Sequence, residues 1–118
     1  MAKNEVYRLG QYVPLPVPEG TKAGDPVRVN GLNAVAVSER NSYEGEFGGH
    51  VGEASTDLGG AHTFNVTVSG GPLKAGQPIY IKADNTLVTV ATDNNLFGHS
   101  LEYNVPNGAH VVTVKIAN

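Results

Sequence analysis

The chain has 118 residues, of which 40% are hydrophobic and 16% charged, and its formal net charge is −3. A domain of this length buries roughly two thirds of the surface that its unfolded chain exposes, so it is large enough to fold without metals or disulfides. The Lys and Arg residues are scattered, which argues against the concentrated basic face that nucleic-acid binding requires. The absence of Cys excludes disulfides and thiolate metal sites.

The composition favours an all-β fold. Fifteen glycines and seven prolines supply the tight turns that join short strands. The first five residues carry charges where a secretion signal needs an apolar core, and no apolar run approaches the ~18 residues of a membrane helix. We therefore expect a soluble, unprocessed protein.

Residues 1–18 are predicted to form an extended N-terminal arm or an edge strand. Pro14, Pro16 and Pro18 have no N–H to donate, which excludes this segment from the centre of a sheet. We expect residues 19–118 to form a single β domain.

One phrase occurs twice in the chain. Lys22-Ala23-Gly24-Asp25-Pro26 returns as Lys74-Ala75-Gly76-Gln77-Pro78, and in both places apolar and polar residues then alternate. This pattern is typical of a glycine-containing turn that leads into a strand with one buried face. The residues predicted to shape these turns are Gly24, Pro26, Gly76 and Pro78.

Each copy of the phrase continues into a predicted hairpin. Asn30-Gly31 is a strong two-residue turn signal before Ala34 to Val37, and Asp84-Asn85 before Leu87 to Val90 is the corresponding signal in the second copy. The chain is thus predicted to contain two similar turn-strand-hairpin units in a small barrel-like or sandwich domain.

The segment between the two copies, residues 39–62, is rich in glycine and has no clear period. Because about 20 residues without structure are uncommon inside a compact domain, we expect a strand around Gly48 to Glu53 and a loop elsewhere. Alternation returns from Thr63 to Val68, and Val112, Val114 and Ile116 share one face of a predicted final strand.

The chain contains histidines and acids that could in principle bind a metal ion. Three or four converging ligands are needed for a metal, and the spacing of the candidates does not favour this. Those candidates are His50, His62, His99, His110, Glu53 and Asp57. We interpret them as surface and turn residues, and we expect no metal and no cofactor.

Glu44 and Glu46 would lie on one face of an extended segment, which is compatible with acid–base chemistry. Their glycine-rich surroundings are expected to form a solvated loop that does not hold carboxylates to catalytic geometry. We expect no catalytic residue and no enzymatic activity.

Several stretches of the chain resemble a family of small tailed-phage capsid proteins that is associated with head decoration, or cement, proteins. The stretches lie in the same order along nearly the whole chain: residues 1–7, 15–27, 31–37, 73–80, 96–98 and 108–116. The resemblance implies a β-rich virion protein that is made in the host cytoplasm, binds the outer surface of the phage capsid and stabilises the head. Its implied partners are the major capsid protein and further copies of itself, as trimers or alternatively dimers.

The N-terminal arm is the segment expected to contact the capsid. An extended arm is suited to adding a strand to an exposed sheet edge, with alternate side chains setting the register. The residues expected to take part are Lys3, Glu5, Val6, Tyr7, Arg8 and Leu9.

A different class of function stays open from the residues alone. A glycan- or receptor-binding module that uses residues 39–62 would display Tyr43 and Phe47 on its surface.

Overall fold

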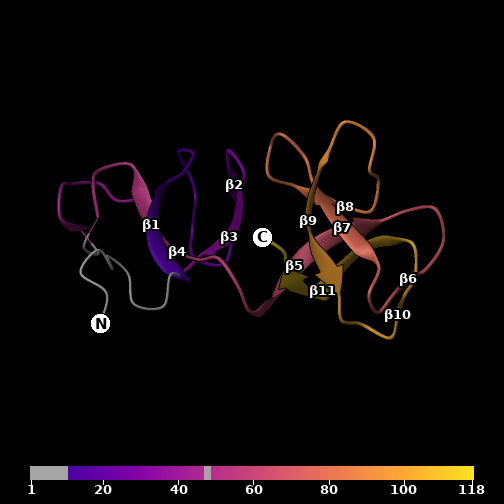
Figure 1. The fold of residues 1–118 in the computed structure, drawn as a ribbon. Helices are drawn as coiled ribbons and strands as arrows, with labels where there is room; N and C mark the ends of the chain where they lie inside the picture. Colours follow the sequence, from indigo (N-terminus) through magenta and orange to yellow (C-terminus); the bar gives the residue numbers. More distant parts are fainter. Residues whose placement is uncertain (1–10, 47–48) are drawn as a thin grey trace.

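The computed structural model describes residues 11–46 and 49–118, and the secondary-structure elements in these ranges are all β-strands (Figure 1). The predicted all-β class is therefore confirmed. In the part of the chain that is described, no helix is long and apolar enough to cross a membrane.

The strands form an open sheet, a closed barrel and a small two-stranded sheet (Figure 1). The open sheet has the order β1-β4-β3-β2 and contains β1 (Tyr12–Pro16), β2 (Pro26–Val29), β3 (Leu32–Ala36) and β4 (Glu53–Asp57). The barrel has the order β11-β5-β8-β7-β9 and contains β5 (Ala61–Val68), β7 (Pro78–Ile81), β8 (Leu87–Val88), β9 (Asn95–Ser100) and β11 (Gly108–Ile116). The small sheet pairs β6 (Leu73–Lys74) with β10 (Asn104–Val105).

The open sheet and the barrel are two versions of one architecture. We call residues 11–58 the first unit and residues 59–118 the second unit. If β8 is left out, the strand order of the barrel is β5-β11-β9-β7. The order of the open sheet is β1-β4-β3-β2, so the counterparts of β1, β2, β3 and β4 are β5, β7, β9 and β11. The registers agree as well. Ala36 of β3 pairs with Thr56 of β4, and their counterparts, Ser100 of β9 and Val114 of β11, also pair with each other. The repeated phrase is thus the most visible part of a repeat that spans the described chain.

The repeated phrase forms the same turn in both units. The N–H of Gly24 donates to the carbonyl of Ala36, and the N–H of Gly76 donates to that of Ser100, both at 2.7 Å. Both glycines have positive φ, 94° and 86°, which is the left-handed region that favours glycine. Pro26 and Pro78 are the first residues of the strands that follow.

The residue between glycine and proline closes each turn through its side chain. The Asp25 carboxylate accepts a hydrogen bond from the N–H of Lys22 at 2.9 Å, and the Gln77 amide oxygen accepts one from the N–H of Lys74 at 2.7 Å. Asp and Gln differ in charge, but both place an acceptor oxygen where the turn needs one.

The equivalence of the second hairpin differs from the sequence prediction. Its strands do pair, since Tyr80 lies opposite Val88. However, the counterpart of β3 is β9 and not β8: the N–H of Ala36 donates to Asp25, and the N–H of Ser100 donates to Gln77, at 2.9 Å in both cases. β8 is an additional strand, and it closes the barrel by pairing parallel to β5.

The two units have cores of different size. Buried side chains of the first unit are small, because alanine fills three of the five core positions: Val17, Val27, Ala34, Ala36 and Ala54. The second unit buries larger residues, among them Phe64, Ile79, Ile81, Leu87 and Phe97, and the Phe64 and Phe97 rings meet edge to face at 5.4 Å. Val35 from the first unit belongs to this larger core, so β3 joins the two units.

The glycine-rich region 39–62 contains more strand than expected, and the strand lies later in the chain. The prediction was Gly48 to Glu53; the structure has β4 at Glu53–Asp57, between β1 and β3. Gly48 lies outside the described residues. Gly52 has a φ of 87°, so the chain turns there and can enter a sheet only afterwards.

Gly98 offers a test of the packing in the second unit. A Cβ at this position would collide with the carbonyl oxygen of Lys115 and lie 2.9 Å from Cγ1 of Val114. Gly98→Ala is therefore expected to lower the free energy of unfolding by about 1–3 kcal/mol. Gly31→Ala is the matched control, because no atom lies within 4 Å of its Cβ position. Equal unfolding midpoints for the two variants in urea would contradict this packing.

Candidate functional site

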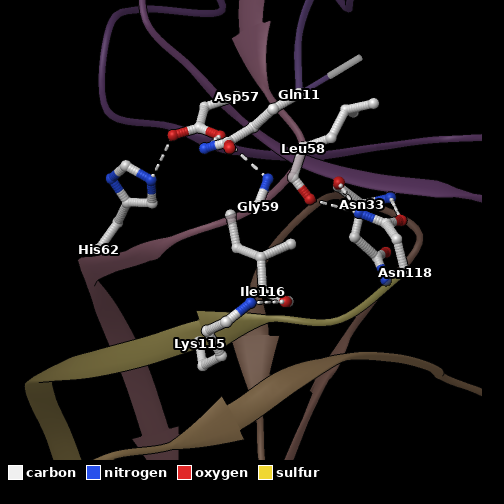
Figure 2. A network of polar contacts seen from close by, with 9 residues as sticks. All are labelled: Gln11, Asn33, Asp57, Leu58, Gly59, His62, Lys115, Ile116 and Asn118. Carbon is white, nitrogen blue, oxygen red and sulfur yellow. Dashed lines mark hydrogen bonds and ion pairs between the residues drawn. The ribbon is translucent and has the colours of Figure 1, made fainter. Parts of the chain in front are cut away.

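A network of polar contacts joins the two units (Figure 2). Asn33 from β3 and Asn118, near the end of the chain, bind each other through side chain and backbone. The N–H of Asn33 donates to Oδ1 of Asn118, and Nδ2 of Asn118 donates to the carbonyl of Asn33, both at 2.8 Å. We call this reciprocal pair the asparagine clamp.

The Asn33 side chain uses both of its N–H donors and its acceptor oxygen in hydrogen bonds. Its Nδ2 donates to the carbonyls of Leu96 and Ala117, each at 2.8 Å, and its Oδ1 accepts from Arg28 at 2.8 Å. Asn33 is only 3% exposed, so these bonds replace water in a buried place. This residue therefore holds the first unit to two segments of the second.

A buried carboxylate forms the other side of the junction. Asp57 ends β4 and accepts hydrogen bonds from the side chain of Gln11 at 2.8 Å and the N–H of Gly59 at 2.9 Å. Its other oxygen lies 2.9 Å from Nε2 of His62, at the start of β5 (Figure 2). Asp57 thus ties the segment before β1 to the beginning of the second unit.

The pKa of Asp57 reflects these contacts. Burial raises it, but the hydrogen bonds from Gly59, Gln11 and His62 outweigh burial and hold the pKa below its usual value. A lowered pKa means that the carboxylate stabilises the fold above the pKa of the unfolded chain, and that this contribution is lost as the pH falls through the folded pKa.

The candidate metal ligands are not brought together. Asp57 and His62 are in contact, but His99 lies on β9 opposite Lys115, and His110 contacts the carbonyl of Asn107. Across residues 11–46 and 49–118, no three His, Asp or Glu side chains gather as a metal site would need.

Carboxylates in the loop before β4 are held more firmly than the sequence indicated. Glu44 accepts from the N–H of Val51 at 2.8 Å, and Glu46 accepts from the N–H of Ser42 at 2.6 Å. Glu53 accepts from the N–H of His50 at 2.8 Å. Each carboxylate thus accepts a hydrogen bond from a backbone N–H of the loop itself, and all three bonds are exposed to solvent, so the solvated loop without catalytic geometry stays a prediction.

Glu44 also contacts the imidazole of His50, and both side chains are exposed. The hydrogen bond from His50 lowers the pKa of Glu44, and the same bond raises the pKa of His50. The contribution of His50 to stability is therefore present below its unfolded pKa and lost as the pH rises through the folded one.

A cavity of about 470 Å³ lies beside this loop, with Glu19, Lys22, Glu39 and Arg40 in its lining. Tyr43 is exposed, and Phe47 lies outside the described residues. Glycan or receptor binding by residues 39–62 stays a prediction.

The surface carries exposed apolar side chains at equivalent positions of the two units. Leu32 and Leu96 begin or nearly begin β3 and β9, with exposed fractions of 39% and 41%. Val37 and Leu101 directly follow the same two strands, with exposed fractions of 49% and 52%. The repeat therefore displays two similar apolar corners.

The residues predicted to contact the capsid lie outside the described part of the chain: Lys3, Glu5, Val6, Tyr7, Arg8 and Leu9. Sequence reasoning missed Gln11, Asn33 and Asn118. For Asn33 a signal existed, because a lone polar residue interrupts the apolar run from Leu32 to Val37.

A family model described as phage cement protein matches residues 8–116, which takes in both units. No curated protein and no protein of known structure matched the chain.

The contact between Glu44 and His50 can be tested by NMR titration. We expect His50 to titrate above the ordinary histidine value of about 6.5, and Glu44→Gln to return its pKa toward that value because the charged acceptor is lost. Equal thermal unfolding of the two proteins is the control that the fold is intact. An unchanged His50 titration in the variant would rule the contact out.

Proposed function

We propose, because this chain belongs to the phage cement protein family, that it binds the outer surface of a phage capsid and stabilises the head. The observation that carries this proposal is the extent of the family match, residues 8–116, which includes every strand of the structure. The match therefore extends over the strands of both units and is not confined to an isolated motif.

A stabilising role is consistent with how the polar groups of the body are used. Hydrogen bonds join the two units through Asn33, Asp57 and Asn118. A body held together in this way transmits force between its contact points, which suits a protein that grips a shell under internal pressure. These groups support a structural role and not an enzymatic one.

The partner in this proposal is the major capsid protein at junctions between its assemblies, on the outside of a virion whose components are made in the host cytoplasm. The protein would act as a homo-oligomer, with a trimer favoured over a dimer. Joining several weak contacts in one oligomer strengthens attachment by ~10² to 10⁴ without new contacts. The exposed apolar corners at Val37 and Leu101 are surfaces that either kind of contact would cover.

The N-terminal arm is proposed to make the primary contact by adding a strand to the capsid, through Lys3, Glu5, Val6, Tyr7, Arg8 and Leu9. Ordering an arm costs roughly 1–2 kcal/mol per residue, so a single arm binds modestly. Its boundary follows from the contacts of Gln11, whose side chain is bound to Asp57 and whose carbonyl accepts from Leu58. A truncation that spares the body therefore ends at residue 10.

Binding to undecorated phage heads tests the proposal. Purified full-length protein is expected to appear as regular outer density in cryo-electron micrographs of such heads, and the protein without residues 1–10 is expected to lose most of this occupancy. Equal thermal unfolding of the two proteins is the control for an intact body. Full-length protein that leaves the heads bare would refute capsid binding; truncated protein at full occupancy would refute the role of the arm.

A further inference from the structure

The match between the two units continues beyond β3 and its counterpart β9. The N–H of Val37, the residue after β3, donates to the carbonyl of Ser55 at 2.8 Å. The N–H of Leu101, the residue after β9, donates to the carbonyl of Thr113 at 2.9 Å. Positions in the segments that follow these two residues can therefore be compared.

Asn41 occupies a position at which the second unit has an apolar residue. It lies four residues after Val37, as Val105 lies four residues after Leu101. Val105 belongs to the core of the second unit, and Asn41 is buried as well, with an exposed fraction of 2%. A buried amide lowers stability unless its donors and its acceptor are hydrogen-bonded, so the side chain of Asn41 needs partners.

Asn41 has one polar atom without a partner. Its N–H donates to the carbonyl of Glu53 at 2.7 Å, its carbonyl accepts from Gly52 at 3.0 Å, and Nδ2 donates to the carbonyl of His50 at 3.0 Å. Its Oδ1 has no hydrogen-bond partner in the described chain. Asn41 lines the cavity of about 470 Å³, whereas those three partners do not. Oδ1 is therefore the group that Asn41 has left for a ligand in this cavity.

The same cavity contains two carboxylates that are also unpaired. Glu19 and Glu39 are exposed in its lining, and neither side chain has a hydrogen bond or an ion pair within the described residues. Of the two cations in the lining, Arg40 donates through Nε to the carbonyl of Val17 at 3.0 Å. Lys22 is exposed and makes no ion pair with either carboxylate. Apart from Lys22, the charged and amide groups left unpaired in the cavity are thus acceptors.

We propose that this cavity binds a lysine side chain of a partner protein. An ammonium group has three N–H donors on a compact charged head, which suits the separate acceptors of Glu19, Glu39 and Asn41. The planar fork of arginine is matched instead to a single carboxylate. Val51, exposed in the same lining, supplies an apolar contact for the lysine stem. The site adds a contact of the body to the proposed function, on which it rests for the identity of the partner as the capsid protein.

An NMR titration of the full-length protein with Nα-acetyl-L-lysine methylamide tests the site. We expect saturable shifts of the Asn41 side-chain amide signal and of the Ser42 and Val51 backbone amide signals. The same probe acetylated on its ε-nitrogen has lost the charge and should leave these signals unchanged. Signals that do not shift, or that shift equally with both probes, would overturn the proposal.

Substitutions in the lining separate a specific site from the effect of net charge. Glu39→Gln is expected to weaken binding of the lysine probe about two- to fivefold, the effect of one exposed ion pair. Asp93→Asn removes the same charge outside the lining and should leave the affinity unchanged. Lys22→Ala removes a neighbouring cation and should strengthen binding. Equal affinities of the Glu39→Gln and Asp93→Asn proteins would refute the site, as would weaker binding by Lys22→Ala.

Binding to undecorated heads distinguishes this proposal from the proposed function. At protein concentrations below saturation, Glu39→Gln is expected to occupy fewer sites on the heads than Asp93→Asn. Equal occupancy would mean that no capsid lysine enters the cavity, while capsid binding itself would stand. If the wild type leaves the heads bare, the proposed function fails, and the titration with the lysine probe still decides whether the site exists.

Discussion

The reciprocal bonding of Asn33 and Asn118 is the constraint on which the arrangement of this molecule depends. It joins a buried position of β3 to the end of the chain, 85 residues later. A polar side chain at 3% exposure is tolerated only when its donors and acceptors are satisfied, and here the partners come from both units. The clamp therefore stabilises the body only while the two units are docked.

The repeat explains why docking is needed. The open sheet of the first unit has an alanine-rich core, which buries little apolar area for its length. The second unit has a closed barrel and a core with two phenylalanines. Val35 of the first unit is buried in that larger core, so the first unit buries additional apolar surface by packing against the second unit. The same strand order thus forms a closed barrel with a larger core in the second unit and an open sheet with a smaller core in the first.

Local patterns were sufficient to predict much of the fold. The repeated turns, the Asn30-Gly31 hairpin and the alternation in β5 and β11 depend on neighbouring residues, and these elements lie where the sequence places them. The match of β3 with β9 depends on a hydrogen bond from Ser100 to Gln77, which no local pattern encodes. The strand in residues 39–62 was predicted too early in the chain, because the length of the segment indicated that a strand is present but not where it begins, and Gly52 turns the chain just before β4.

In the candidate site too, local features could be predicted from the sequence and contacts between distant residues could not. The binding of Glu44, Glu46 and Glu53 to loop amides requires a folded loop and was not predicted from the sequence. The junction was missed for a similar reason, since Asn118 acquires its role only when the end of the chain returns to β3. Sequence patterns indicate turns and faces, whereas contacts between distant segments need coordinates.

A two-unit body that unfolds as one piece is the central claim, and residue-resolved NMR during urea unfolding tests it most directly. Methyl signals of Ala34 and Ala54 report the first unit, and those of Val66 and Val112 report the second. The account predicts a single shared midpoint in the wild type. In Asn33→Ala, the first unit should unfold at lower urea than the second. Separate midpoints already in the wild type, or an Asn33→Ala protein that unfolds like the wild type, would contradict it.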